Sequence, residues 1–251
     1  MRVKFHKEIE FFIKKYFISE SYLLKRRILR SLKKKDEEEL TILDKIVPKD
    51  SDSVDVGVYR GVYSYRLSNF SKHVYGFEPN PLIFNFLKKN LTKIVNNLTL
   101  YNYALSDKTT STLLKIPRRF KNSNKSNYEE FYKLGCATIH QKNNLHDEFD
   151  NFQVKSIKLD DILTKNNIGF IKIDVEGHEK NVLLGSVNII NKFKPNLLVE
   201  IEERHSQESV LDTINFINSL GYKSYYFDGQ NLNSTSKLSN LNLKNNYIFL
   251  R

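Results

Sequence analysis

The sequence has one cysteine, one methionine and no tryptophan among its 251 residues. The single cysteine, Cys136, excludes an internal disulfide and a zinc site built from cysteines. Apolar runs are short, and none approaches the roughly 18 residues of a membrane-spanning helix. The first ten residues mix charges with Phe and Ile and lack the uninterrupted apolar core of a signal peptide. We therefore expect a protein of the reducing cytoplasm.

Acidic residues are scarce at the N-terminus. Residues 1–35 hold 12 Lys and Arg against three acids, so most of the net charge of +11 lies there and the remaining chain is close to neutral. Apolar residues of this segment recur at helical spacing, at Phe5, Ile9, Phe12, Ile13, Tyr16 and Phe17 and again at Leu23, Leu24, Ile28 and Leu32. We expect residues 1–50 to be a basic amphipathic helical extension, with two helices in residues 1–47.

Three roles are open for this extension. It could pack on its own domain or on a second subunit, lie on a membrane surface or another anionic polymer, or bind nucleic acid. We expect a peripheral membrane contact or self-association through residues 1–47 ahead of nucleic-acid binding.

After Pro48 the pattern changes to alternating strands and helices, which is typical of a doubly wound α/β fold with a mostly parallel sheet. Residues 51–251 are expected to form this domain. A single helix is expected from Val182 to Phe193. The polar, asparagine-rich stretch 108–152 is predicted to be a substrate loop or lid. Parallel strands are predicted at 53–58, 73–77, 98–105, 170–175 and 197–201, and an antiparallel edge at 222–227 and 247–250.

Polar residues end three successive strands. Asp55 lies near Gly57 in the first, Glu78 ends the second, and Ser106 and Asp107 end the third. Open α/β sheets bind ligands at these ends. The glycine spacing differs from the dinucleotide fingerprint, and a carboxylate at residue 55 would repel a pyrophosphate. Each acid alone could be a helix cap or a solvated turn, but together they fit an amine, a ribose and an adenine without phosphate, as in S-adenosylmethionine.

Five stretches together resemble the FkbM-type methyltransferases, a branch of the class I S-adenosylmethionine-dependent enzymes. They are Asp55-Val-Gly-Val-Tyr-Arg-Gly-Val-Tyr-Ser64, Phe77-Glu-Pro-Asn-Pro81, Ala104-Leu-Ser-Asp107, Leu159-Asp-Asp-Ile-Leu163 and Ile171-Lys-Ile-Asp-Val-Glu-Gly-His-Glu179. The resemblance covers roughly residues 52–205. It implies a seven-stranded Rossmann-like sheet and O-methyl transfer, often to sugars or natural products. One departure is Val58-Tyr59, where the family commonly has Ala-Asn.

The resemblance also implies where the cofactor binds. The first motif and the end of the second strand would hold S-adenosylmethionine, and the end of the third strand would flank its adenine. The residues concerned are Asp55, Gly57, Val58, Tyr59, Gly61, Tyr63, Ser64, Glu78, Pro79, Asn80, Ser106 and Asp107.

Charged residues also converge at the ends of the strands at 170–175 and 197–201. They are Asp174, Glu176, His178, Glu200, Glu202 and His205. Methyl transfer to oxygen requires a positioned acceptor and often a base. We predict His178 as the base because its unperturbed pKa lies near working pH. Glu176 and Asp174 would orient it, contact the acceptor or face the sulfonium charge.

Other interpretations of this second group stay open. His178 and Glu179 could simply begin a helix, where acids are favourable. Asp174 and Glu176 could instead hold a divalent metal together with a glutamate of the next strand, although no spaced metal motif supports this. Lys172 is buried in its predicted strand and needs a partner, for which we expect Glu200.

The sequence as a whole predicts an S-adenosylmethionine-dependent O-methyltransferase acting on a hydroxyl of a sugar, glycan or related small metabolite. One alternative is a methyltransferase acting on nucleic acid. The other is a weakly catalytic or non-catalytic binding module of the same fold, docked on a membrane or anionic polymer through its basic N-terminus.

Overall fold

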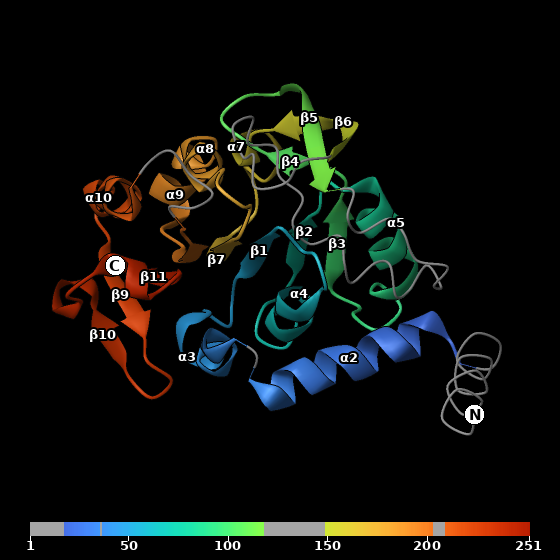
Figure 1. Cartoon of the computed structure of the whole chain (residues 1–251), viewed down its shortest axis with the longest axis horizontal. Helices are drawn as coiled ribbons and strands as arrows, with labels where there is room; N and C mark the ends of the chain where they lie inside the picture. The colour runs from blue at the N-terminus through green and yellow to red at the C-terminus, as the bar shows by residue number, and fades with distance from the viewer. Residues whose placement is uncertain (1–17, 36, 118–148, 203–208) are drawn as a thin grey trace.

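A computed structural model describes residues 18–35, 37–117, 149–202 and 209–251 (Figure 1). Its centre is an eight-stranded sheet in the order β10-β9-β11-β8-β7-β1-β2-β3. The strands are β1 (Asp52–Val56), β2 (Val74–Phe77), β3 (Leu98–Tyr101), β7 (Ile168–Ile173), β8 (Asn196–Glu200), β9 (Lys223–Phe227), β10 (Leu232–Ser234) and β11 (Asn246–Leu250). Strands β3, β2, β1, β7 and β8 run parallel, and β11 lies antiparallel between β8 and β9. The predicted doubly wound sheet with an antiparallel edge is therefore confirmed.

The expected number of seven strands is wrong by one. Strand β10 lies in the polar loop between the two aromatic strands and pairs antiparallel with β9, Leu232 opposite Phe227. The turn before it is held by Asp228, whose Oδ1 accepts hydrogen bonds from the backbone N–H groups of Gln230 and Asn231 at 2.9 and 2.6 Å. Such side-chain closure of a turn allows a short polar segment to fold back as a strand.

Strands also occur where the sequence predicted a continuous strand or a loop. The chain leaves the large sheet after Tyr101 and enters a second, three-stranded sheet in the order β4-β6-β5, beside the end of β3 in Figure 1. At the break, the Asn102 side-chain amide donates to the carbonyl oxygens of Glu78 and Pro79 at 2.8 and 3.1 Å. The strands are β4 (Ala104–Leu105), β5 (Thr110–Pro117) and β6 (Phe149–Ile157). The stretch expected to be a loop, 108–152, thus begins and ends in strands.

Helices cover both faces of the large sheet, and each face has its own apolar core. Alternate residues of one strand serve the two cores: in β7, Phe170 packs with the first and Ile171 with the second. The first core lies under α2 (Glu20–Lys34), α3 (Leu43–Ile46), α4 (Val62–Leu67) and α5 (Pro81–Asn90), and the second under α7 (Leu159–Ile162), α8 (Glu179–Leu184), α9 (Val187–Phe193) and α10 (Val210–Ser219).

The predicted helix from Val182 to Phe193 is two helices, α8 and α9. They meet at Gly185, where an added Cβ would lie 2.0 Å from the carbonyl oxygen of Ser106. The Gly185 carbonyl oxygen in turn accepts a hydrogen bond from the Asp160 N–H at 3.1 Å. Close packing of this backbone against β4 and α7 therefore breaks the helix.

In the N-terminal extension, α2 packs against α4 and α5. Leu24 and Ile28 are fully buried in the first core, and the helix begins at Ser19, whose hydroxyl accepts from the Tyr22 N–H at 3.2 Å. The other predicted helix, up to Phe17, lies outside the described residues. Across the described ranges, no helix combines the length and apolar character needed to cross a membrane.

Candidate functional site

The ends of β1 and β7 lie side by side, because Val56 is paired with Ile173. Just beyond them, a Cβ added at Gly57 would lie 1.9 Å from the carbonyl oxygen of Asp174, and Gly57 has φ +86°. The backbone that approaches Gly57 is that of Asp174, so the turns that follow β1 and β7 are packed directly on each other.

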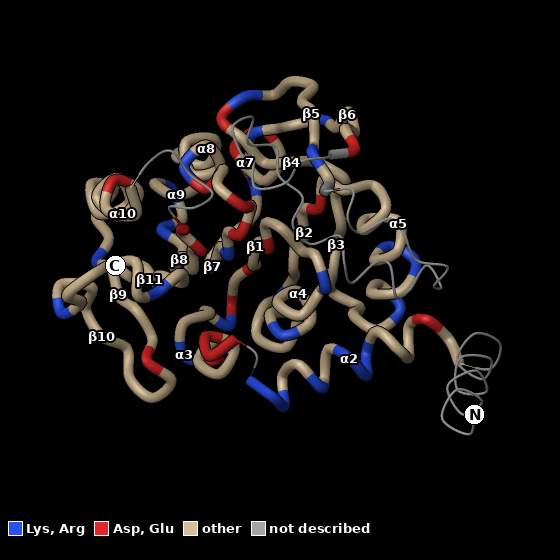
Figure 2. The backbone as a smooth tube through the Cα atoms, in the orientation of Figure 1, with Lys and Arg blue, Asp and Glu red and all other residues tan. Residues whose placement is uncertain are grey.

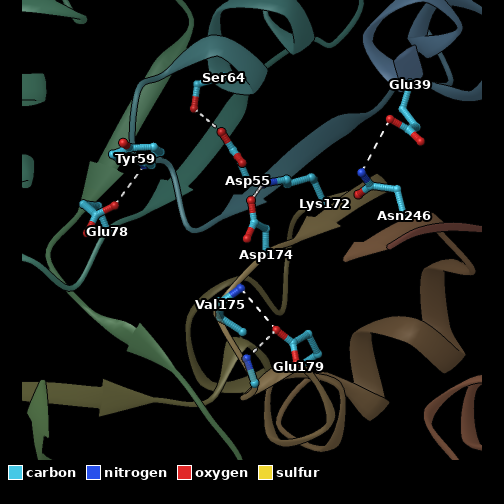
Figure 3. A network of polar contacts seen from close by, with 11 residues as sticks. Glu39, Asp55, Tyr59, Ser64, Glu78, Lys172, Asp174, Val175, Glu179 and Asn246 are labelled. Atoms are coloured by element: carbon cyan, nitrogen blue, oxygen red, sulfur yellow. Dashed lines mark hydrogen bonds and ion pairs between the residues drawn. The ribbon is translucent and has the colours of Figure 1, made fainter. Parts of the chain in front are cut away.

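Glu78 holds the turn that follows β1. Its Oε2 accepts from the Tyr59 N–H and its Oε1 from the Asn80 N–H, both at 2.9 Å (Figure 3). Tyr59 has φ +45°, an unusual backbone conformation for a residue with a bulky side chain. Burial raises the pKa of Glu78 to about 7, against the lowering effect of the two N–H donors. Glu78 therefore joins the ends of β1 and β2.

Asp55 points beneath the same turn. It is fully buried, and its Oδ2 accepts from the Ser64 hydroxyl of α4 at 2.5 Å. Burial raises its pKa to about 6, while the nearby positive charge of Lys172 lowers it. Asp55 therefore anchors α4 to β1 from below.

Lys172 of β7 forms an ion pair with Asp174, the residue just after that strand, Nζ to Oδ2 2.6 Å. The expected pairing with Glu200 is therefore corrected: the carboxylate two residues along the chain is in direct contact. Lys172 also lies 4.5 Å from the ring centroid of Tyr63. Burial lowers the pKa of Lys172, but Asp174 and Asp55 outweigh burial and hold that pKa above its usual range.

A cavity of about 260 Å³ opens above these strand ends. Six predicted site residues line it: Gly57, Tyr59, Glu78, Pro79, Asp174 and Glu176. The lining residues that were not among the predicted site residues are Glu37, Val56, Phe77, Ile83, Tyr103, Ala104, Leu105, Leu114, Val175 and Glu200. Along the sheet, Asp174, Glu176 and Glu200 thus lie at the ends of β7 and β8, Glu78 lies at the end of β2, and Tyr103, Ala104 and Leu105 lie beyond β3.

Glu37 is a lining residue that no sequence motif indicated. It lies in the N-terminal extension, between α2 and the 3-10 helix at Glu38–Thr41, outside every motif. Its negative charge raises the pKa of Asp55 and Lys172. Glu39 beside it is within hydrogen-bonding distance of the Asn246 side chain of β11, 3.5 Å (Figure 3). The extension thus forms part of the cavity wall.

Several predicted cofactor residues support the cavity from outside its lining. Asn80 caps α5 by accepting from the Leu82 N–H at 3.0 Å. Gly61 is the residue before α4, and Val58 and Tyr63 are buried in the first core. Ser64 holds Asp55, as described above.

Ser106, Asp107 and His178 form a separate cluster at the join of β4 and α8. The Ser106 hydroxyl lies 2.9 Å from His178 Nε2 and donates to Asp107 Oδ1 at 3.0 Å. Asn181 of α8 donates to the same Asp107 oxygen at 3.1 Å. These residues are not part of the cavity lining. His178 therefore links two elements of the fold, and its prediction as a base has no geometric support at the cavity. The predicted His205 lies outside the described residues.

The turn after β7 is held by Glu179. Its Oε1 accepts from the N–H of Gly177 at 2.9 Å and from that of Val175 at 3.4 Å. Glu176, inside this turn, has φ +55°, a strained backbone conformation. The turn therefore depends on the buried carboxylate of Glu179 for its shape. Burial raises the pKa of Glu179 to about 7.

Glu200, at the end of β8, faces the same acidic end of the cavity. Burial raises its pKa, and the negative charges of Asp174 and Glu176 raise it further. Within the described ranges, no group of three or more His, Cys, Asp or Glu side chains is arranged to hold a metal ion.

Solved structures that are similar to this chain include several methyltransferases. A methyltransferase FkbM from Methylobacillus flagellatus shares 17% identity at a TM-score of 0.51, over 80% of this chain and 44% of that one. An rRNA methylase from Streptococcus thermophilus shares 12% identity at 0.43, over 85% and 95%. A putative methyltransferase from Streptococcus mutans in complex with SAH shares 12% at 0.44, over 84% and 93%. A search of curated proteins found no match.

A family model decides the assignment. The model of the methyltransferase FkbM domain matches residues 55–224, which include the end of β1, both cavity-lining turns and β8. This match spans more than half of the chain, whereas the Methylobacillus protein is more than twice as long as the part it shares. The chain therefore belongs to the FkbM family of methyltransferases.

Proposed function

We propose that this protein transfers a methyl group from S-adenosylmethionine to a hydroxyl of a sugar, glycan or related small metabolite in the cytoplasm. The observation that carries the proposal is the polarity of the cavity. In the order of the strands, Tyr103 and Leu105 lie beyond β3, Glu78 lies at the end of β2, and the carboxylates of Asp174, Glu176 and Glu200 lie at the ends of β7 and β8. S-adenosylmethionine has the matching order of groups.

The residues that line the cavity fit this cofactor. The Glu78 carboxylate would accept hydrogen bonds from both ribose hydroxyls, the usual role of an acid at the end of the second strand. Tyr103, Ala104 and Leu105 would enclose the adenine, with Ser106 and Asp107 beyond it. Asp174 and Glu37 would lie near the ammonium and sulfonium charges. When bound, the cofactor supplies a methyl group activated by its sulfonium.

The acidic end would also serve the acceptor. Asp174 is held in the 2.6 Å ion pair with Lys172, whereas burial and the neighbouring acids raise the pKa of Glu200 to about 9. Once ionised, a carboxylate of raised pKa is a stronger base than an ordinary one, and Glu200 lines the cavity whereas His178 does not. We therefore place Glu200 ahead of His178 as the group that takes the acceptor's proton at alkaline pH, with Glu176 as an acceptor contact.

Acceptor choice would depend on the second sheet. Leu114 of β5 lines the cavity, and β5 leads into residues 118–148 before β6 returns. The prediction that residues 108–152 select the acceptor is therefore part of the proposal. The hydroxyl-bearing class remains the proposal because carboxylates are good hydrogen-bond acceptors for polyols, and they would repel the phosphates of nucleic acid.

The test has two stages. Isothermal titration with S-adenosylmethionine, using wild type, Glu78→Gln and the exposed control Asp50→Asn, should show weaker binding only in Glu78→Gln. Sugars, glycans and RNA are then offered with labelled cofactor. Methylation of a hydroxylated small molecule supports the proposal, and methylation of RNA alone contradicts it. Cofactor binding without transfer to any acceptor would favour the binding-module alternative.

A further inference from the structure

The outward side of α2 is a basic surface, and no residue of this helix lines the cavity. The helix carries six cations, Lys25, Arg26, Arg27, Arg30, Lys33 and Lys34, and one acid, Glu20. That acid is bonded to Lys89 of α5, Oε2 to Nζ 2.9 Å. Figure 2 shows the cations recurring along the helix, with acidic colour only near its start. The charge of the helix surface is therefore almost wholly positive.

The cations share their side of the helix with two large apolar residues. Tyr22 is 58% exposed and Leu29 is 47% exposed. At 100° per residue, Tyr22, Leu29 and Lys33 fall on the outermost line of the helix, with Lys25, Arg26 and Arg30 beside them. All four of these cations are exposed. The opposite side, with Leu24 and Ile28, is buried against the domain. The helix thus uses one apolar face for its own core and has a second, mixed face outward.

We propose that this outward face, made of Tyr22, Lys25, Arg26, Leu29, Arg30 and Lys33, docks the protein on an anionic lipid membrane. Clusters of four or more Lys and Arg on a helix bind anionic headgroups. The tyrosine ring and the leucine side chain gain by entering the headgroup boundary. A nucleic acid would use the cations equally well but would leave Leu29 without a favourable site. The two exposed apolar residues therefore favour a membrane over a nucleic acid as the partner.

The rigidity of α2 makes the docking specific in orientation. The helix is capped by Ser19 and held by Leu24 and Ile28, so its outward face does not need to fold on binding. Glu37, three residues after the last residue of α2, lines the cavity. A docked helix would therefore hold the cavity at a fixed distance from the lipid surface.

Vesicle flotation of the full-length protein tests this. Vesicles of phosphatidylcholine with phosphatidylglycerol should bind the wild type at low salt, whereas phosphatidylcholine alone should not. Replacing Lys25, Arg26, Arg30 and Lys33 by Gln should lower the binding more than about tenfold, because each cation near a charged surface contributes separately. The matched control replaces four exposed lysines elsewhere, Lys49, Lys165, Lys223 and Lys237, by Gln and should bind as the wild type.

A second pair of variants separates lipid from polyanion. Tyr22→Ser with Leu29→Ser should weaken vesicle binding several-fold while leaving any binding to heparin or RNA unchanged. Circular dichroism checks that all variants are folded. The proposal is overturned by any of three results: no vesicle binding by the wild type, equal binding of the cation variant and its control, or no effect of the Tyr22 and Leu29 changes.

Discussion

Lys172, on β7, and Asp174, just after its end, form a 2.6 Å ion pair, with the lysine 3% exposed. The positive charge of Lys172 lowers the pKa values of Asp55 and Glu200. The negative charges of Asp174 and Asp55 in turn raise the pKa of Lys172. The floor of the cavity is therefore an acidic cluster with one buried cation at its centre. Its stability and its chemistry should both depend on that cation.

Removal of the cation should destabilise the fold. In Lys172→Met, Asp55 and Asp174 lose their nearest positive charge, and loss of one partner of a buried pair costs about 3–5 kcal/mol. Urea unfolding at pH 8 measures the loss, with the exposed Lys72→Met as control. The loss should shrink at pH 5, where the raised pKa of Asp55 allows it to become neutral. A change below about 1 kcal/mol at pH 8 would mean that the pair is dispensable.

Glu78→Gln should weaken S-adenosylmethionine binding roughly 10- to 100-fold, because hydrogen bonds to a charged group contribute about 1.5–3 kcal/mol. In the free protein the pKa of Glu78 is about 7, so wild-type affinity should rise as pH increases through 7 and the carboxyl ionises. Titration calorimetry at pH 6 and pH 8 measures both effects. The Gln variant should lose this pH dependence. Equal affinity of the two proteins would remove Glu78 from the site.

Buried acids should make the ligand-free protein less stable as pH rises. Glu179 has a folded pKa of about 7 against an ordinary value of 4.5, so the folded state binds the proton more tightly than the unfolded state. Its contribution is fully present below pH 4.5 and is lost as pH rises to about 7. Glu179→Gln should lower the pH dependence of unfolding between pH 5 and 8 by about 2 kcal/mol. An unchanged slope would contradict the burial of this carboxyl.

Glu200→Gln should lower kcat about 100-fold or more once an acceptor is known, since general base catalysis contributes 10²–10⁴. His178→Ala should cost less than about tenfold, because the imidazole contacts Ser106 and does not line the cavity. The pH profile of kcat distinguishes the two roles. If the profile loses its acidic limb in His178→Ala and keeps it in Glu200→Gln, the imidazole is the base.

The strand ends of the site could be predicted because a buried parallel strand has a local sequence pattern. It is a short apolar run followed by a glycine or an acid. Gly57, Glu78 and Asp174 were all found in this way. The pairing of Lys172 could also have been found, since strand alternation places residues 172 and 174 on one face. Glu37 could not, because its place at the cavity follows from how α2 packs on the domain, which no local pattern encodes. Strand β10 was missed for a related reason: its three residues are polar, and only the turn at Asp228 brings them to β9.

The burial of α2 also bears on how the chain is made. Synthesis proceeds from the N-terminus, at about 5–20 residues per second. Helix α2 therefore leaves the ribosome before residues 62–90, which supply the α4 and α5 surfaces that cover Leu24 and Ile28. For that interval of several seconds the nascent helix presents both of its apolar faces and all of its cations at once. A chaperone or a lipid surface would therefore bind the nascent chain more strongly than the folded protein.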